Sequence, residues 1–430
     1  MKIIVAGAGI GGLYAAGRLA KAGHDVTVYE REKSARDMRY DWYDDVSPKV
    51  FEKLSIPLPE GSFPKRDWTF CAPYGDASLY CTQDPHHTDY SVERQPLNDA
   101  LINNLSGAKL IFGSNVSGAA VENGAVVGAY VDGKLVDCDL LIDSAGVNSP
   151  VRNSVAGFFG FETVDKGETF FAYRAMYELI PGAPVPEKDT NKVYLKHLGE
   201  NGISWCIYQP QGGYADVLVG RTHELTEETL DKAMTDLRAQ NPFYTDKVVR
   251  GGRRAIIPVR KPLSLFVANG YAAIGDAACF TIPMIGSGIE SSLNAGEFLA
   301  ETVISKNSSK VEVLWEYQVK CFKEFGARHV GVDVMKKWLL GTAANDVKYF
   351  LTSGVITEKD MNAAAIGKPV KVTIDSIPAR IKNIRGHAGF VLSLLGILDK
   401  SKRGVSAAKM IPKTYNEKTV ARWIERYKKL

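Results

Sequence analysis

The chain opens with KIIVAGAGIGGLYAAGRLAKAGHDVTVYER, residues 2–31, and this stretch decides the fold class. A β-branched run leads into a group of glycines, an Ala- and Leu-rich segment closed by Gly23 follows, and HDVTVYER is typical of a second strand. The order predicts a βαβ unit. Because parallel strands joined through a helix form a sheet with both faces covered, we expect an α/β fold.

The glycine fingerprint GAGIGG lies between the first strand and its helix. Gly7 permits a tight turn, Gly9 lets a pyrophosphate approach the backbone, and Gly12 allows close packing of helix on strand. The helix N-terminus offers free N–H groups to that pyrophosphate. Glu30 ends the second strand, where it can accept hydrogen bonds from an adenosine ribose, and Arg31 beside it is a further candidate cofactor contact. The pattern predicts a bound dinucleotide rather than a turn that binds nothing.

Composition sets the broad class. A chain of 430 residues with 45% hydrophobic and 24% charged residues suits two or three globular domains and excludes a disordered or fibrous protein. Six cysteines without a CxxC pair fit neither a disulfide framework nor a zinc module, so we expect a reducing compartment. His86 and His87 have no third ligand at useful spacing, and we expect no metal site.

Two observations concern membranes. The first apolar run is broken by glycines, and the longest late one, GFVLSLLGIL, is far shorter than a membrane span, so we expect a cytoplasmic protein that lies at most on a membrane surface. The net charge of +4 is uneven, because residues 371–430 carry 14 Lys and Arg against 4 Asp and Glu. Such an end could meet anionic lipid, an acidic partner or a phosphorylated substrate, or could simply be a solvated helical tail. No nucleic-acid recognition motif accompanies the charge, so nucleic acid is not an expected partner.

A second motif follows much later. The strand YAAIGDAA ends in Gly275-Asp276 and precedes Gly286, Gly288 and a new helix. With these residues the chain resembles the two-domain flavoprotein family of aromatic hydroxylases, halogenases and geranylgeranyl reductases. That family carries a similar Gly-Asp motif, whose acid binds the ribityl hydroxyls of FAD, and a middle motif similar to DLLIDSAGVNSPVR. Arg94 in SVERQPLNDAL matches its flavin-contacting arginine. The resemblance implies FAD as the cofactor.

The resemblance also predicts the domain arrangement: a Rossmann-type FAD-binding domain, an inserted antiparallel-sheet substrate domain and a helical C-terminal region. The aromatic and β-branched runs within residues 168–221 fit that inserted sheet. The predicted limits are 1–75, 92–160 and 250–305 for the FAD-binding domain, 76–91 and 161–249 for the substrate domain, and 306–430 for the helical region. Within the helical region the stretch KPVKVTI, residues 368–374, is expected to be extended.

Three details resemble the geranylgeranyl reductase branch: the loop GSGI at residues 286–289 followed by Asn294-Ala295-Gly296, the preceding stretch VVRGGRRAIIPVRKPLSLFVANGYAAIGDAA, and the segment ISWCIYQP. Gly286-Ser287-Gly288-Ile289 opens a helix whose N-terminal dipole is expected to stabilise reduced flavin. ISWCIYQP is similar to the aromatic-x-Trp-x-aromatic-Pro segment of that branch, although Ile203 replaces the usual aromatic residue. Trp205 and Tyr208 are therefore expected at the substrate wall, with core packing as the alternative.

The branch implies reduction of a C=C bond in a hydrophobic substrate such as an isoprenoid, lipid, quinone or enone. Hydride would pass from flavin N5 to one carbon, and an acid would protonate the other. The branch often has a cysteine in the loop near residues 40–46, whereas this chain has none there. We expect Tyr43 or Asp44 to replace it; the alternative is that the aromatic residues merely pack and the acids are solvated. Cys279 is expected to be a small buried thiol.

The electron donor and the rival functions stay open. Because the fingerprint occurs once, NAD(P)H or a reduced electron carrier would bind transiently. One rival is a flavin-dependent monooxygenase or halogenase on the same scaffold. The other is a non-catalytic lipid-binding protein of this fold.

Overall fold

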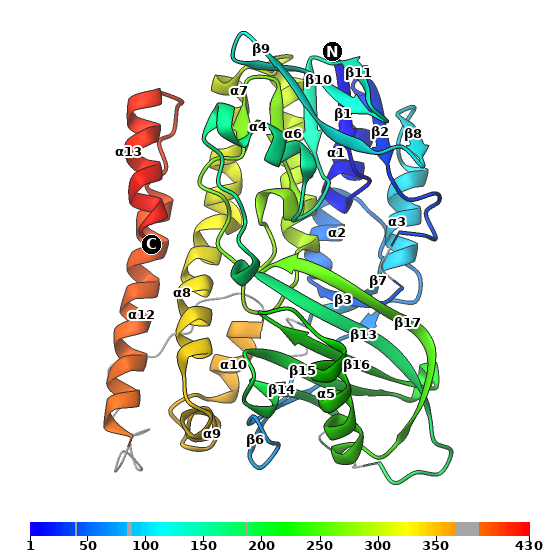
Figure 1. Ribbon diagram of the computed structural model, residues 1–430, viewed down its shortest axis with the longest axis vertical. Coiled ribbons are helices and arrows are strands. Elements are labelled where there is room, and N and C mark those ends of the chain that lie inside the picture. Colours follow the sequence, from blue (N-terminus) through cyan, green and yellow to red (C-terminus); the bar gives the residue numbers. More distant parts are fainter. Residues whose placement is uncertain (39–40, 84–87, 186–187, 189, 366–386) are drawn as a thin grey trace.

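The computed structural model describes residues 1–38, 41–83, 88–185, 188, 190–365 and 387–430. A six-stranded sheet organises the N-terminal half (Figure 1). Its strands, in spatial order, are β18 (Val267–Ala268), β19 (Tyr271–Ala273), β12 (Leu140–Asp143), β1 (Lys2–Ala6), β2 (Asp25–Glu30) and β8 (Lys109–Phe112). All neighbours pair in parallel except β18 with β19. The predicted βαβ unit is confirmed, with α1 (Ile10–Lys21) joining β1 to β2.

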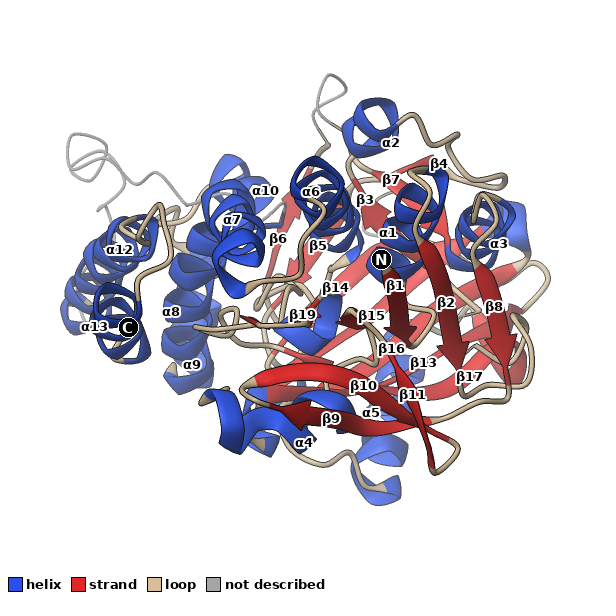
Figure 2. Cartoon of the chain, turned by 90° about the horizontal axis from the view of Figure 1, so that it is seen from above, coloured by secondary structure: helices blue, strands red, loops and turns tan. Residues whose placement is uncertain are grey.

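Both faces of this sheet are covered, as its buried strands require. Figure 2 shows α1 and α6 (Ile289–Lys306) on one side, and a three-stranded sheet with α4 (Pro150–Phe159) on the other. That smaller sheet has the order β11 (Lys134–Asp137), β10 (Ala125–Val131) and β9 (Val116–Glu122). The segment KLVDCDLLIDSAG, residues 134–146, is divided between the two sheets. Its first part is β11, mostly exposed, whereas its second part is the fully buried β12 of the six-stranded sheet.

The predicted antiparallel sheet is confirmed and is larger than expected. It has seven strands in the order β17 (Tyr244–Pro258), β13 (Thr169–Leu179), β16 (Tyr214–Arg221), β15 (Gly202–Gln209), β14 (Asn191–Leu195), β5 (Trp68–Cys71) and β6 (Ser78–Cys81). Only β14 and β5 pair in parallel. The predicted domain limits at residues 75–76 and 249–250 fall between β5 and β6 and inside β17, so the sheet draws on segments from both sides of each limit.

Further elements connect strands within and between these sheets. They are η1 (Lys166–Glu168), η2 (His197–Gly199), η3 (Pro210–Gly212), α2 (Pro48–Leu54), α3 (Arg94–Asn103), α5 (Glu227–Gln240), and the small sheet of β3 (Tyr43–Val46), β7 (Tyr90–Glu93) and β4 (Phe63–Pro64). α5 begins after Thr226, whose hydroxyl accepts a hydrogen bond from the Thr229 N–H and caps the first turn. Its buried side chains contribute to the core on one face of the seven-stranded sheet.

The described residues from 289 onward are mainly helical, in line with the helical region predicted for residues 306–430. After η4 (Gly275–Ala278) and α6 come α7 (Val311–Cys321), the π-helical turn η5 (Phe322–Gly326), α8 (Ala327–Gly341), α9 (Ala344–Thr352), α10 (Glu358–Ala365), α12 (Ala388–Lys409) and α13 (Glu417–Lys428). α12 runs alongside α8 (Figure 1). Within the described ranges, no helix combines the length and the apolar character that crossing a bilayer requires. The stretch 368–374 lies outside the described residues.

Candidate active site

The fingerprint glycines form a tightly packed turn. Gly7 has φ +86°, which favours glycine, and Gly9 caps the N-terminus of α1. A Cβ atom on Gly9 would lie 2.5 Å from the Ser144 Oγ, and one on Gly12 would lie 2.6 Å from the Ser144 Cβ. The turn after β12 therefore approaches the fingerprint so closely that larger residues would collide with it.

Glu30 holds this turn in place. Its carboxylate accepts hydrogen bonds from the Ala8 N–H at 2.8 Å and from the Glu32 N–H at 3.0 Å, and the residue is only 8% exposed. Arg31 next to it is largely exposed and lies 3.7 Å from Glu32. Both Glu30 and Arg31 line the cavity that begins at the fingerprint, so the structure brings the predicted adenosine-end residues together.

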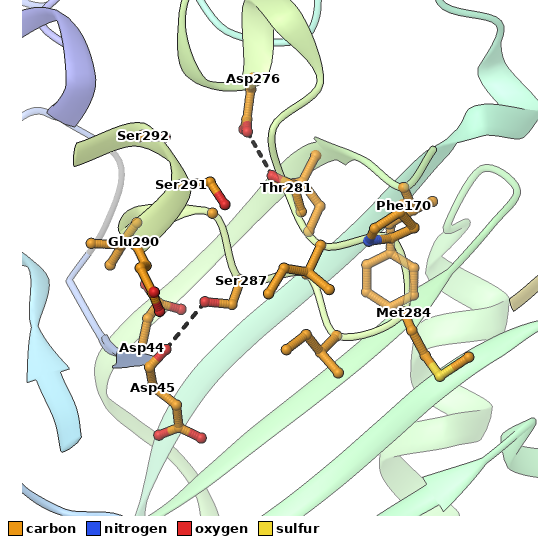
Figure 3. Close-up of a pocket in the computed structure, with 18 of the residues that line it drawn as sticks. Asp44, Asp45, Phe170, Asp276, Thr281, Met284, Ser287, Glu290, Ser291 and Ser292 are labelled. Carbon is orange, nitrogen blue, oxygen red and sulfur yellow. Dashed lines mark hydrogen bonds between the residues drawn. The ribbon is translucent and has the colours of Figure 1, made fainter. Parts of the chain in front are cut away.

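Asp276 lies at the other end of the predicted dinucleotide site. Its Oδ1 accepts a 2.6 Å hydrogen bond from the Thr281 hydroxyl (Figure 3). Burial raises the pKa of the Asp276 carboxyl, while the Thr281 hydrogen bond and the charge of Arg94 oppose that shift. The chain then turns through Gly286, with φ +75°, to Gly288, the N-cap of α6.

The start of α6 is as predicted, with Ile289 as its first residue. Its N-terminus lies beside Asp276, because a Cβ atom on Gly288 would be 2.9 Å from the Thr281 Oγ1 and 3.6 Å from the Asp276 Oδ1. The helix dipole therefore makes this end of the cavity favourable to negative charge. Figure 3 shows Asp44, Asp45 and Glu290 on one side of the pocket and Phe170 and Met284 on the other.

Arg94 and Asp44 meet at this site although they are 50 positions apart in the sequence. Arg94 is the first residue of α3, and its Nε lies 3.3 Å from the Asp44 Oδ2. The other oxygen of Asp44 lies 3.7 Å from a guanidinium nitrogen of Arg174. Asp44 is thus an ion-paired carboxylate rather than a freely solvated one.

Arg174 is a functional-site residue that the sequence analysis missed. It is 4% exposed, donates to both Asp216 oxygens at 2.9 and 2.6 Å, and donates to the Tyr43 carbonyl oxygen at 2.7 Å. Its guanidinium also lies 4.8–5.6 Å from the ring centroids of Trp42, Tyr43 and Trp205. The signal was available: Arg174 and Asp216 are charged residues inside two apolar strands, FFAYRAMY and YADVLVG.

Tyr43 is held by the same network. The residue is buried, and its hydroxyl accepts a 3.0 Å hydrogen bond from the Gln209 side-chain amide. Burial, reinforced by the negative charge of Asp216, raises the pKa of Tyr43 well above its usual value. The phenol therefore keeps its proton at neutral pH in a site that lines the cavity.

β15 separates the two predicted substrate residues. Successive side chains of a strand point to opposite faces, and Ile203, Trp205 and Ile207 line the cavity. Tyr208 lies on the other face, where its ring packs against Phe243 with centroids 5.4 Å apart. Of the two residues predicted at the substrate wall, Trp205 lines the cavity, whereas Tyr208 packs against the core on the α5 side of the sheet.

One cavity of about 1210 Å³ joins these parts. It runs from the fingerprint past Asp276 and the residues of Figure 3 to the seven-stranded sheet, and then between that sheet and α8. Cys279 is buried beside it, and burial raises the pKa of its thiol to about 12, as expected for an inert thiol. The tight glycine turn, Glu30 and Asp276 along one cavity fit a dinucleotide that ends in a flavin.

Metal chemistry finds no support in the described ranges. They contain no cluster of three or more His, Cys, Asp or Glu side chains that could hold an ion. His86 and His87 lie outside the described residues.

Comparison with known proteins finds reductases among the proteins to which the chain is similar. The model of the NAD(P)-binding Rossmann-like domain matches residues 5–35. The chain is 20% identical over 426 residues to the digeranylgeranylglycerophospholipid reductase of Sulfolobus acidocaldarius, covering 93% of this chain and 91% of the relative. It is 25% identical to the menaquinone reductase of Mycolicibacterium smegmatis, covering 73% and 78% of the two chains.

Solved structures show the same fold. A geranylgeranyl bacteriochlorophyll reductase-like protein of Thermoplasma acidophilum superimposes with a TM-score of 0.72 at 18% identity, covering 92% of this chain and 98% of that one. The flavin-dependent halogenase CmlS gives 0.60 at 17% identity, covering 100% and 77%. These comparisons agree with the expected oxidoreductase class and with FAD as its cofactor, and they confirm the predicted fold class. The expected resemblance is confirmed: the chain is similar to the geranylgeranyl reductase-like flavoproteins along most of its length and has their fold.

Proposed function

We propose that this protein is an FAD-dependent reductase that saturates a C=C bond of a hydrophobic substrate. The observation that carries the proposal is the single cavity, because it connects the fingerprint and Asp276 to a long chamber with apolar walls. A flavin bound beside Asp276 and a lipid bound in the apolar chamber would meet inside this cavity. The apolar walls would keep water from between them.

The predicted cofactor-binding residues form two groups, one for each end of the FAD molecule. Gly7, Gly9, Gly12, Glu30 and Arg31 would hold the adenosine and pyrophosphate. The isoalloxazine end would lie among a second set of residues: Arg94, Asp276, Gly286, Gly288 and Ile289. When bound and reduced by the electron donor, the flavin would supply the hydride for one carbon of the double bond. The N-terminus of α6 favours the negative charge of the reduced cofactor.

Protonation of the second carbon is the task of the chain itself. Tyr43 and Asp44 are the candidates, and we favour Tyr43. Tyr43 lines the cavity and its phenol carries a proton to donate, whereas Asp44 is paired with Arg94 and Arg174. Arg174 and Gln209 would act as positioning residues, because they hold the Tyr43 backbone and hydroxyl.

The test is anaerobic single turnover. The reduced enzyme is mixed with prenylated quinones, enones and unsaturated lipids, and flavin reoxidation is followed by absorbance. Reoxidation with formation of a saturated product supports the proposal; the absence of reoxidation with every substrate of these classes contradicts it.

Loss of a general acid slows proton transfer by about 10²–10⁴-fold. Tyr43→Phe should therefore slow reoxidation by that factor, while Asp44→Asn serves as the matched comparison. Unchanged rates in both variants would end the donor assignment.

The electron donor would be NAD(P)H or a reduced carrier that binds transiently. The basic C-terminal helices would bring the enzyme to a lipid surface, since Lys402, Arg403 and Lys409 are exposed on α12. Co-sedimentation with vesicles containing anionic lipid checks this: binding that salt fails to weaken would contradict an electrostatic association.

The shared fold of the halogenases keeps an oxygen-dependent reaction as the rival. Reduced enzyme exposed to oxygen together with substrate should then yield a hydroxylated or halogenated product. Purified protein that neither contains nor takes up FAD would instead favour a lipid-binding protein without catalysis.

A further inference from the structure

The far arm of the cavity contains a buried histidine, His329, with one ring nitrogen that lacks a hydrogen-bond partner among the described residues. α7, η5 and α8 form one continuous helical run, and His329 lies one turn after the π-helical segment. Single π-helical turns within α-helices are frequent at functional sites. His329 lines the cavity, is 3% exposed, and its Nδ1 has no hydrogen-bond partner among the described residues.

The surroundings of His329 are apolar. Its ring lies 5.4 Å from that of Phe325, which in turn packs edge-on against Phe280, in the loop that follows Asp276. Val332 and Met335 continue the same wall. His329 therefore faces the part of the cavity that connects the Asp276 loop with the apolar arm.

Three other polar side chains that line this arm have partners. The Lys336 ammonium is bonded to the Val259 carbonyl oxygen and lies 2.9 Å from the Asp333 Oδ1. The Lys196 ammonium donates to two carbonyl oxygens at 2.7 Å, and the Ser401 hydroxyl donates to the Gly331 carbonyl oxygen at 2.9 Å. His329 differs from them because its nitrogen is buried without a partner.

The imidazole is neutral. Burial lowers the pKa of His329 to about 3, and the charge of Arg328 acts in the same direction. A neutral imidazole has one donor and one acceptor nitrogen and is a poor proton source at neutral pH. A buried polar atom without a partner is destabilising, so its presence needs a ligand or a function to explain it.

We propose that His329 hydrogen-bonds an oxygen atom of the substrate and thereby selects oxygen-bearing prenyl lipids over pure hydrocarbons. The oxygen could be a quinone carbonyl or a glyceryl ether, which offer the same chemistry. This inference rests on the proposed function and narrows its substrate class. His329 is a specificity residue in it, while the proton comes from elsewhere.

The test measures binding, without turnover, to the FAD-loaded protein. The probes are a prenylated naphthoquinone, a prenylated glyceryl ether and squalene, which has similar double bonds and no oxygen. Tryptophan quenching reports quinone binding, and equilibrium dialysis reports the other two. The variants are His329→Phe, which removes the hydrogen bond, and His329→Asn, which keeps a polar group near the Nδ1 position. Met335→Leu on the same wall is the volume-conserving control.

Loss of one buried hydrogen bond corresponds to about tenfold weaker binding. We expect His329→Phe to weaken at least one oxygenated probe by that factor while squalene binds as well as before. His329→Asn should recover most of the affinity, and Met335→Leu should change none of it. Whichever oxygenated probe responds identifies the source of the oxygen. Equal affinity of wild type and His329→Phe for both oxygenated probes overturns the inference, as does an equal loss for squalene.

The two proposals can fail separately. If lipids bind in a His329-dependent manner but never reoxidise the reduced enzyme, the His329 site is supported and the proposed reaction is refuted. If squalene reoxidises the enzyme as fast as the oxygenated lipids do, in both wild type and His329→Phe, the proposed reaction is supported and the His329 site is refuted.

Discussion

The packing of the fingerprint against Ser144 yields a prediction that separates two glycines in one motif. In Gly9→Ala the new Cβ would lie 2.5 Å from the Ser144 Oγ and 3.7 Å from the Ser144 Cβ. In Gly12→Ala it would lie 2.6 Å from both the Cβ and the Oγ of Ser144 and 3.0 Å from the Val5 Cγ1. Removing the hydroxyl by Ser144→Ala therefore relieves the collision in Gly9→Ala, whereas the collision with the Ser144 Cβ remains in Gly12→Ala.

The magnitudes follow from general values. Overpacking of this kind lowers the free energy of unfolding by about 1–3 kcal/mol. At Gly9 the loss of glycine at an N-cap adds up to about 1 kcal/mol. At Gly12, inside α1, the helix preference of alanine offsets up to about 1 kcal/mol. We expect both changes to be destabilising, and Gly9→Ala to be the one that a second substitution can rescue. Adding Ser144→Ala should restore about half or more of its loss, with the 3.1 Å contact to the Ser144 carbonyl oxygen keeping the rescue incomplete.

The assay is urea unfolding of the FAD-free protein, combined with FAD titration by fluorescence. Ser144→Ala alone is the control and should be close to neutral. A rescue of Gly12→Ala as large as that of Gly9→Ala would refute the reasoning. So would a Gly9→Ala protein with wild-type stability.

Three further outcomes follow from the site. Arg174→Met should lower the free energy of unfolding by about 3–5 kcal/mol, because the Asp216 carboxylate stays buried without its partner; a loss below about 1 kcal/mol in urea unfolding would contradict this. Because the pKa of His329 is lowered in the folded state, the unfolded chain binds a proton below about pH 6.5 that the folded chain does not bind. The free energy of unfolding should therefore decrease as the pH falls below about 6.5, by up to about 1.4 kcal/mol per pH unit. In His329→Phe the free energy of unfolding should depend less on pH between pH 6 and pH 4. An unchanged dependence would show that other groups cause the acid sensitivity. Trp205→Ala should raise the substrate KM while Tyr208→Phe leaves it unchanged, and equal effects in steady-state kinetics would contradict the facing of β15.

The sequence by itself determined the features that depend on neighbours along the chain. The βαβ unit, the turn at Gly7, the acid at Glu30 and the start of α6 at Ile289 follow from glycine positions, caps and hydrophobic periodicity, which act over a few residues. The order of the motifs was sufficient to indicate the fold class and the cofactor.

Tertiary structure decided what depends on residues far apart in the chain. Trp205 and Tyr208 are equally aromatic, and only the pairing of β15 in its sheet shows which of them faces the cavity. The ion pair of Arg174 with Asp216 joins strands 42 residues apart, and no local pattern shows that a histidine at position 329 lacks a partner. Local propensity is encoded in short windows, whereas burial and contact are properties of the assembled fold, because they depend on which distant surfaces meet.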